Sequence, residues 1–254
     1  MIARLTITAL AMLLLCCMPA VAAAPKGAQA ATLTSSDGHS IAAWYWKPQK
    51  SSAPAVIMLH MLGSDKSAYT EMAGKLVAEG YAAIAIDLRG HGESKFPDGG
   101  NPDYKALTES DFTGMLNDIR AAHDFLADQP EVDADRVAII GASIGANLAI
   151  IYGSGDLRVR TVVALSAGQD YRGLKPAAYL ERYGRRPLYL VCSKADKYSW
   201  ESSVALEKLA TAADPVSLRV FEGKAHGTNL LTEHEGLDDT IVSGWLLNYL
   251  PPKR

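Results

Sequence analysis

The residues with the clearest potential for chemistry lie in one short stretch, G-A-S-I-G at positions 141–145. A serine with glycines two positions before and two positions after it forms the G-x-S-x-G pattern, in which the serine sits on a sharp turn between a strand and a helix. The glycines let strand and helix pass close together while the serine takes a strained backbone conformation. We therefore expect Ser143 to project into solvent as a nucleophile, with the Ile144 N–H available to an oxyanion.

The flanking segments match the strand and the helix that this turn requires. Residues 137–140 are continuously apolar, as in a parallel strand covered on both faces, and residues 146–152 are expected to form the helix. Residues 32–34 and 41–46 predict an opening β-hairpin around an Asp-Gly turn. Further strands are expected at 55–59, 81–86, 161–165, 188–192 and 218–221, and helices at 67–79, 110–127, 200–211 and 233–250.

At this point the sequence resembles the α/β-hydrolase superfamily over nearly all of the chain after residue 30. A second matching stretch is D-L-R-G-H-G-E-S at 87–94, which looks like the loop that shapes a turn in these hydrolases. The resemblance implies the α/β-hydrolase fold, with a mostly parallel central sheet, helices on both faces, an N-terminal antiparallel hairpin and a short cap. The hairpin, the cap and the H-M-L-G-S-D-K loop at 60–66 are most similar to the dienelactone-hydrolase and small-esterase branch.

The same resemblance implies two partners for Ser143. The superfamily places its base in a glycine-flanked loop after the last strand, where this chain has His226, and its acid commonly in the loop that here contains Asp196. Some lipases take the acid one strand earlier, so Asp170 is the alternative. Serine, acid and base then follow in the chain order of this fold. In such an arrangement the imidazole takes the serine proton, and the carboxylate holds the imidazole tautomer.

By the same resemblance, the Leu62 N–H is the second oxyanion donor, although Met61 stands where glycine is usual. Residues 169–186 leave room for a short cap, so the pocket should be comparatively open. The residues that could line it, or else pack in the core, are Met61, Tyr69, Tyr104, Tyr198 and Trp200.

Several other reactive side chains are expected to be structural. His60 should brace the loop that follows its strand, His123 should be a surface or packing residue of a helix, and His234 should fall inside the closing helix. Ser94 lacks a strand-to-helix turn, and Cys192 lies in an apolar run as a buried small hydrophobe.

The charge balance of the chain argues against nucleic acid as a partner. The 254 residues carry 25 lysines and arginines against 28 acidic residues, so no basic field favours nucleic acid. Metal and dinucleotide motifs are missing from the sequence, and we expect no metal and no cofactor.

The expected activity is hydrolysis of a small carboxylic ester through an acyl-serine intermediate. The alternatives are a peptidase or thioesterase with the same three residues, or a non-catalytic binding domain of this fold. The sequence does not indicate an oligomeric state.

The N-terminus predicts export to the periplasm or secretion. Residues 1–24 have the layout of a signal peptide, in which Arg4 precedes an apolar stretch and then small residues. Small-x-small cleavage signals end at residues 22, 24 and 30, and residues 31–254 would form one catalytic domain. An uncleaved anchor is the alternative, because the apolar stretch approaches the length of a membrane span. Lipidation at Cys16 or Cys17 is disfavoured because leucine precedes Cys16.

Overall fold

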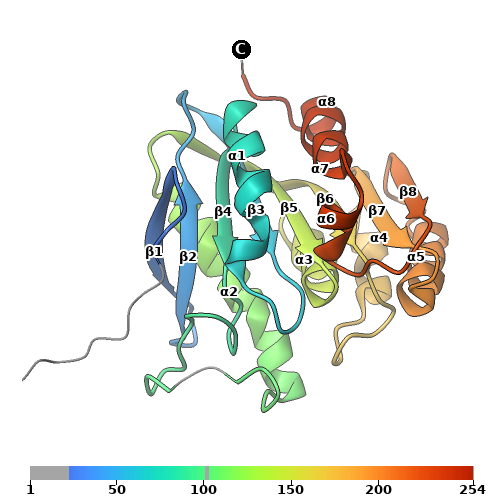
Figure 1. The fold of residues 1–254 in the computed structure, drawn as a ribbon, viewed down its shortest axis with the longest axis horizontal. Coiled ribbons are helices and arrows are strands. Elements are labelled where there is room, and N and C mark those ends of the chain that lie inside the picture. Colours follow the sequence, from blue (N-terminus) through green and yellow to red (C-terminus); the bar gives the residue numbers. More distant parts are fainter. Residues whose placement is uncertain (1–22, 101–102, 254) are drawn as a thin grey trace, which may run out of the picture.

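The computed structural model describes residues 23–100 and 103–253, so the expected signal peptide lies almost entirely outside the described residues. One eight-stranded sheet organises this part of the chain, in the order β1-β2-β4-β3-β5-β6-β7-β8 (Figure 1). The strands are β1 (Ala28–Thr34), β2 (Ser40–Trp46), β3 (Ala53–Leu59), β4 (Ala82–Ile86), β5 (Val132–Ala142), β6 (Val159–Leu165), β7 (Leu188–Ser193) and β8 (Val216–Phe221).

Strands β3 to β8 run parallel, whereas β1 and β2 form an antiparallel hairpin that joins the sheet at β4. This confirms the predicted α/β-hydrolase architecture. The hairpin is longer than expected, because Ala28, Gln29 and Ala30 already pair with β2. The fold therefore begins three residues before the expected domain start at residue 31.

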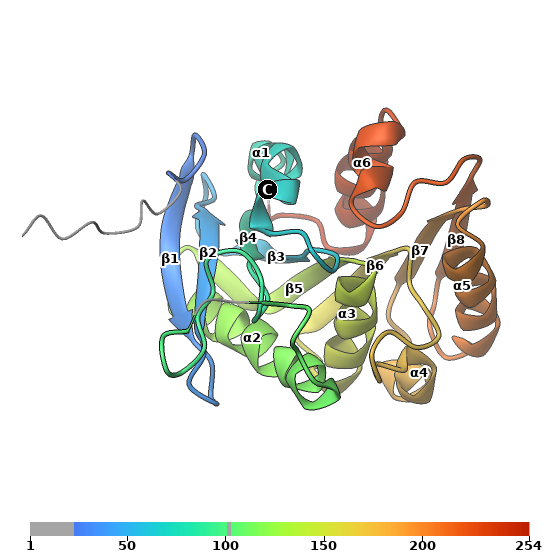
Figure 2. The ribbon, with the colours of Figure 1, turned by 60° about the horizontal axis from the view of Figure 1, so that its bottom comes forward.

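Helices cover both faces of the sheet (Figure 2). One core cluster joins the sheet to α2 (Glu109–Ala127), α3 (Ile144–Gly155), α4 (Leu180–Tyr183) and α5 (Lys197–Leu209). The other joins it to α1 (Thr70–Ala78), to α6 (Asn229–Glu233) and to the C-terminal helical segments α7 (Leu237–Asp239) and η3 (Thr240–Leu246). Short 3₁₀ turns, η1 (Lys66–Tyr69) and η2 (Pro176–Tyr179), precede α1 and α4, and α8 (Leu247–Tyr249) ends the helical part.

The prediction of one closing helix over 233–250 is wrong at its start. Helix α6 ends at Glu233, and a turn separates it from α7. Gly236 takes a left-handed conformation with φ 76°, which lets the chain change direction there. His234 consequently lies outside the helix that follows, and its ring stacks on Phe221 of β8 with the centroids 4.1 Å apart.

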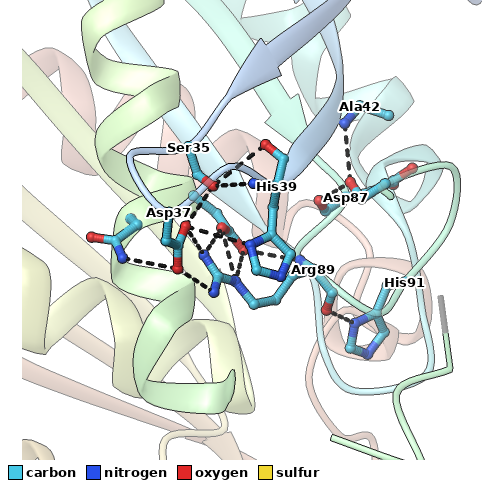
Figure 3. Close-up of polar contacts among 10 residues, drawn as sticks. Ser35, Asp37, His39, Ala42, Asp87, Arg89 and His91 are labelled. Atoms are coloured by element: carbon cyan, nitrogen blue, oxygen red, sulfur yellow. Dashed lines mark hydrogen bonds and ion pairs between the residues drawn. The ribbon is translucent and has the colours of Figure 1, made fainter. Parts of the chain in front are cut away.

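The buried Arg89 fixes the loop that follows β4 through two ion pairs, at the end of the sheet where the candidate site lies. The guanidinium of Arg89 binds Asp118 of α2, with Nη2 2.6 Å from Asp118 Oδ1. It also binds Asp37 of the β1–β2 turn, with Nη1 2.6 Å from Asp37 Oδ2 (Figure 3). Asp118 is fully buried. Burial raises the pKa of Asp118, and Arg89 opposes that increase. Arg89 therefore ties the hairpin, the loop and α2 together.

Replacing Arg89 by methionine should lower the free energy of unfolding by about 3–5 kcal/mol, because Asp118 would stay buried without its partner. Urea unfolding measures this change. Adding Asp118→Asn should recover part of the loss, since a neutral amide is cheaper to bury than a carboxylate. Arg185→Met is the control: its ion pair with Asp214 is exposed, at 85% and 66%, and should contribute less than about 1 kcal/mol. Equal effects of the two Arg→Met changes would contradict this account.

Candidate active site

The turn between β5 and α3 has the geometry that its glycines predict. Ser143 has φ 54° and ψ −115°, a conformation that residues with side chains rarely adopt. A Cβ on Gly141 would overlap the Gly145 carbonyl group, and a Cβ on Gly145 would overlap the Leu59 carbonyl oxygen of β3. The expected strand, sharp turn and helix are therefore present, with Ser143 immediately before the first residue of α3.

Ser143 is nevertheless only 5% exposed, so the prediction that it projects into solvent is wrong. Its hydroxyl contacts His226 and lies on the wall of a cavity that the segment after β6 also lines. The serine thus faces a sheltered space rather than bulk water.

The structure brings the three predicted residues into one hydrogen-bonded row. Ser143 Oγ lies 2.8 Å from His226 Nε2, and His226 Nδ1 lies 2.6 Å from Asp196 Oδ2. They follow β5, β8 and β7, whose carboxyl ends meet at the same edge because these strands are parallel. If Nδ1–H donates to the carboxylate, Nε2 carries a lone pair and accepts from the serine hydroxyl. This arrangement can take a proton from the serine.

The alternative acid, Asp170, has other partners. Its carboxylate accepts a hydrogen bond from the Gly173 N–H at 2.8 Å and faces Lys175 at 3.5 Å. In the described part of the chain, the carboxylate that reaches His226 Nδ1 is that of Asp196. The geometry therefore favours Asp196 over Asp170 as the partner of the imidazole.

The residue after His226, Gly227, is held in place by residues of two other loops. The Gly227 N–H donates to Ser166 Oγ at 2.9 Å, and Ser166 is itself fully buried with φ 55°. A Cβ on Gly227 would lie 2.7 Å from Met61 Sδ, so the loop packs tightly against Met61. The sequence analysis missed Ser166. Its signal was a serine placed directly after the buried strand β6.

His60 orients the peptide group that carries the Leu62 N–H. Its Nδ1 donates to the Met61 carbonyl oxygen at 2.8 Å, and its Nε2 accepts from the Leu88 N–H at 3.0 Å. Burial, with His91 adding to it, lowers the pKa of His60 to about 3, so the ring stays neutral near pH 7 and keeps both bonds. In a trans peptide the N–H points opposite to the preceding carbonyl, so the Leu62 N–H points away from His60. The expected bracing role of His60 is confirmed.

Leu62 and Ile144 both line the cavity beside Ser143. Among the described residues, neither of their N–H groups has a hydrogen-bond acceptor. Two unpaired backbone donors next to a serine hydroxyl are the arrangement that can stabilise negative charge on a carbonyl oxygen. Leu62 therefore lies beside the site even though Met61 stands where glycine is usual.

The cavity at Ser143 has a volume of about 380 Å³. Of the five residues that the sequence suggested as possible lining residues, Met61 does line the cavity. Tyr69 is instead fully buried, and its hydroxyl donates to the Leu59 carbonyl oxygen at 2.9 Å. The part of the cap that lines the cavity is the segment Asp170 to Arg172, before η2 and α4. The lining residues are Met61, Leu62, Ser143, Ile144, Asp170, Tyr171, Arg172 and His226.

Tyr171 and Arg172 were missed by the sequence analysis, because the segment after β6 shows no periodic pattern that would place its side chains. A tyrosine and an arginine directly after Asp170 were the signal that could have found them. Both belong to the cap and not to the sheet.

The remaining reactive side chains have structural contacts. The Ser94 hydroxyl donates to the Asp87 carbonyl at 2.6 Å and accepts from the Ala42 N–H at 3.0 Å. His123 is buried on the inner face of α2, where its ring nitrogens meet the Tyr152 hydroxyl and the Ala134 carbonyl. Burial raises the pKa of Cys192 to about 11, which leaves it an unreactive thiol near neutral pH.

Residues 23–100 and 103–253 contain no cluster of three or more side chains that could hold a metal ion. Within the same ranges, no helix combines the length and the apolar character needed to cross a membrane.

Comparison with known proteins gives one family match, since the model of the dienelactone hydrolase family matches residues 41–236. An uncharacterized protein of Mycobacterium tuberculosis is 34% identical over 116 residues, which are 45% of this chain and 37% of the relative. The esterase Pf2001 of Pyrococcus furiosus superposes with a TM-score of 0.72 at 22% identity, covering 88% of this chain and 93% of the esterase. A dienelactone hydrolase of Anabaena variabilis gives a TM-score of 0.65 at 18% identity, covering 88% and 99%. These structural similarities show the α/β-hydrolase fold.

Replacing Gly145 by alanine should destabilise the protein by about 1–3 kcal/mol, because the new methyl group must displace α3 from the end of β3. Chemical denaturation measures the loss. Gly155→Ala, at the other end of the same helix, is the matched control. A Cβ there has nothing within 4 Å, so the change should raise the stability or alter it by less than about 1 kcal/mol. A Gly145→Ala protein as stable as the wild type would show that the approach of helix and strand is not tight.

Proposed function

The chain belongs to the dienelactone hydrolase family, and we propose that within this family it is a serine hydrolase that cleaves small carboxylic esters. The family match and the esterase-like fold support a hydrolase. The observation that carries the finer proposal is the row from Ser143 through His226 to Asp196, at 2.8 Å and 2.6 Å, on the wall of an accessible cavity.

In the proposed mechanism, Ser143 Oγ attacks the ester carbonyl carbon while His226 Nε2 takes the serine proton. The carbonyl oxygen becomes an oxyanion and is stabilised by the Leu62 and Ile144 N–H groups, each of which would contribute about 10²–10³ in kcat. The adjoining N-terminus of α3 adds a favourable dipole. Asp196 holds the imidazole tautomer and stabilises the imidazolium that forms.

Collapse of the tetrahedral intermediate breaks the bond to the alcohol oxygen, which leaves with the proton from His226. An acyl-serine remains. A water molecule, activated by the same imidazole, then attacks the acyl carbon, and a second collapse releases the carboxylic acid and restores Ser143. The first proton transfer, from Ser143 to His226, runs along a contact of 2.8 Å that the structure already holds.

The shape of the cavity supports a small or accessible substrate. Its volume of about 380 Å³ lies near the lower end of the range for ligand sites, roughly 300–1,000 Å³. Met61, Leu62 and Ile144 supply apolar surface near the serine, which suits a short acyl chain. The cap is too short to enclose a long one.

Changing Ser143 to alanine should lower kcat for p-nitrophenyl esters about a millionfold and abolish labelling by a fluorophosphonate probe. Asp196→Asn should lower kcat by about 10⁴, because the amide favours the wrong imidazole tautomer. Asp170→Asn is the matched comparison and should leave kcat within about threefold, since its carboxylate does not hold the imidazole. A larger loss for Asp170→Asn than for Asp196→Asn would reassign the acid. Persistent turnover by Ser143→Ala would remove the nucleophile from this proposal.

We also propose that the protein is exported and that cleavage follows residue 22 or 24 rather than residue 30. Cleavage after Ala30 would remove Ala28, Gln29 and Ala30, which pair with Trp46, Tyr45 and Trp44 in the β1–β2 hairpin. Cleavage after residue 22 or 24 leaves that strand complete.

Intact-mass analysis of the protein from a periplasmic or culture fraction should therefore give an N-terminus at residue 23 or 25. A truncated protein that starts at residue 31 should be less stable than one that starts at residue 25, because it lacks three strand pairings at the edge of the sheet. Full-length protein in the cytosolic fraction, or a mature chain that starts at residue 31, would contradict this proposal.

A further inference from the structure

Tyr171 places a phenol hydroxyl at the candidate site. The side chain lines the cavity together with Ser143 and His226, and its ring meets the imidazole edge-to-face with the centroids 6.4 Å apart and an interplanar angle of 87°. Burial raises the pKa of Tyr171, while the neighbouring hydroxyls of Ser199 and Ser143 partly offset the increase. The phenol is therefore protonated at neutral pH and can act as a hydrogen-bond donor.

The hydrogen bonds of Tyr171 leave this donor available. Its oxygen lies 3.1 Å from Ser199 Oγ, a contact in which either hydroxyl can donate. It donates a long hydrogen bond of 3.4 Å to the Ser166 carbonyl oxygen, and the Ser143 hydroxyl is a further neighbour. When Ser199 donates to the phenol oxygen, the phenol proton is directed either at this distant carbonyl or toward Ser143 and the cavity. A substrate oxygen in the cavity can replace the Ser166 carbonyl oxygen as the acceptor of the phenol proton, because little hydrogen-bond energy is lost.

Ser199 connects Tyr171 to the base. It is fully buried in the first turn of α5, and its Oγ lies 3.3 Å from His226 Nδ1, the nitrogen that also contacts Asp196. The phenol, Ser199 and the imidazole are thus held as one unit.

The topology of the sheet puts Tyr171 on a particular side of the serine. Ser143 follows β5, which lies between β3 and β6. The loop with the Leu62 N–H follows β3, whereas Tyr171 follows β6, on the side from which β8 brings His226. The alcohol oxygen of an ester must lie on the His226 side, because the imidazolium gives it a proton. Tyr171 therefore faces the position of the leaving group and not that of the oxyanion.

We propose that Tyr171 is a catalytic residue that donates a hydrogen bond to the departing alcohol oxygen, so that the enzyme cleaves esters of unactivated alkyl alcohols. This inference rests on the proposed function. As the tetrahedral intermediate collapses, the C–O bond to the alcohol breaks and its electron pair moves to the alcohol oxygen. That oxygen takes the proton from His226 Nε2, and the oxyanion reforms the carbonyl group. Tyr171 keeps its proton and stabilises the negative charge that develops before the transfer is complete.

The test compares two esters of one acid, ethyl butyrate and p-nitrophenyl butyrate, through kcat/KM of the wild type and of Tyr171→Phe. Nitrophenoxide is a stable anion that needs little help to leave, whereas ethoxide needs a donor. We expect Tyr171→Phe to lose about ten- to a hundredfold on the ethyl ester and less than about threefold on the nitrophenyl ester. The rate of fluorophosphonate labelling at Ser143 should stay close to that of the wild type, because this reaction also has a stable leaving group.

Tyr179→Phe, at a 39% exposed tyrosine of the cap, is the matched control and should change neither ester. Similar losses of Tyr171→Phe on both esters, together with slower labelling, would show that Tyr171 only supports the fold of the loop. Unchanged turnover of both esters would show that its hydroxyl has no role, and either result overturns the inference. If the wild type turns over neither ester and Ser143 is not labelled, the proposed function fails, and this inference fails with it.

Discussion

The close approach of α3 to β3 is the constraint on which the site depends. Because Gly145 lies directly against the Leu59 carbonyl, the helix can begin immediately after Ser143 and direct its first N–H groups at the cavity. The strained backbone of Ser143 costs about 1–3 kcal/mol and persists only where the surroundings prevent relaxation. They do so here, since every residue of α3 from Ile144 to Ser154 is buried. The position of Ser143 is thus set by packing that extends well beyond the cavity.

Behind the loop that contains Leu62, paired charged groups, rather than apolar packing, hold two neighbouring loops together. The fully buried Asp87 carboxylate accepts from the Lys66 ammonium at 2.7 Å and from the Glu93 N–H at 2.8 Å, which ties the loop after β3 to the loop after β4. Buried charges are stable only when they are paired in this way. The rings of His60, His91 and Tyr104 fill the space between the two loops, with centroids 4.9 Å and 5.1 Å apart.

The sequence allowed the local parts of this arrangement to be predicted, because each depends on a short pattern. The glycines around Ser143 can be read as a requirement for close approach, and apolar runs identify the buried parallel strands. Assigning Asp196 and His226 needed the family resemblance, since they lie on separate loops and meet through the order of the strands. The low exposure of Ser143 and the place of Tyr171 depend on how the cap folds back over the sheet. Its segment has no periodic pattern from which that could be inferred.

The two kinds of prediction correspond to two physical parts of the site. Ser143, Ile144 and His60 sit on or beside buried elements of the sheet and α3, whose positions are fixed by packing and buried hydrogen bonds. Tyr171 and Arg172 belong to the cap, where Arg172 has φ 54° and its guanidinium lies 5.8 Å from the centre of the Phe112 ring of α2. Part of the cap is itself packed on α3, since Asn147 donates to the Leu174 carbonyl oxygen at 2.8 Å and Leu180 and Tyr183 belong to the same core cluster as α3. Arg172 instead lines the cavity, so a change there can alter what the cavity accepts without removing these contacts. Under the proposed function, the sheet and α3 therefore set the class of reaction, and the cap residues that line the cavity select the substrate.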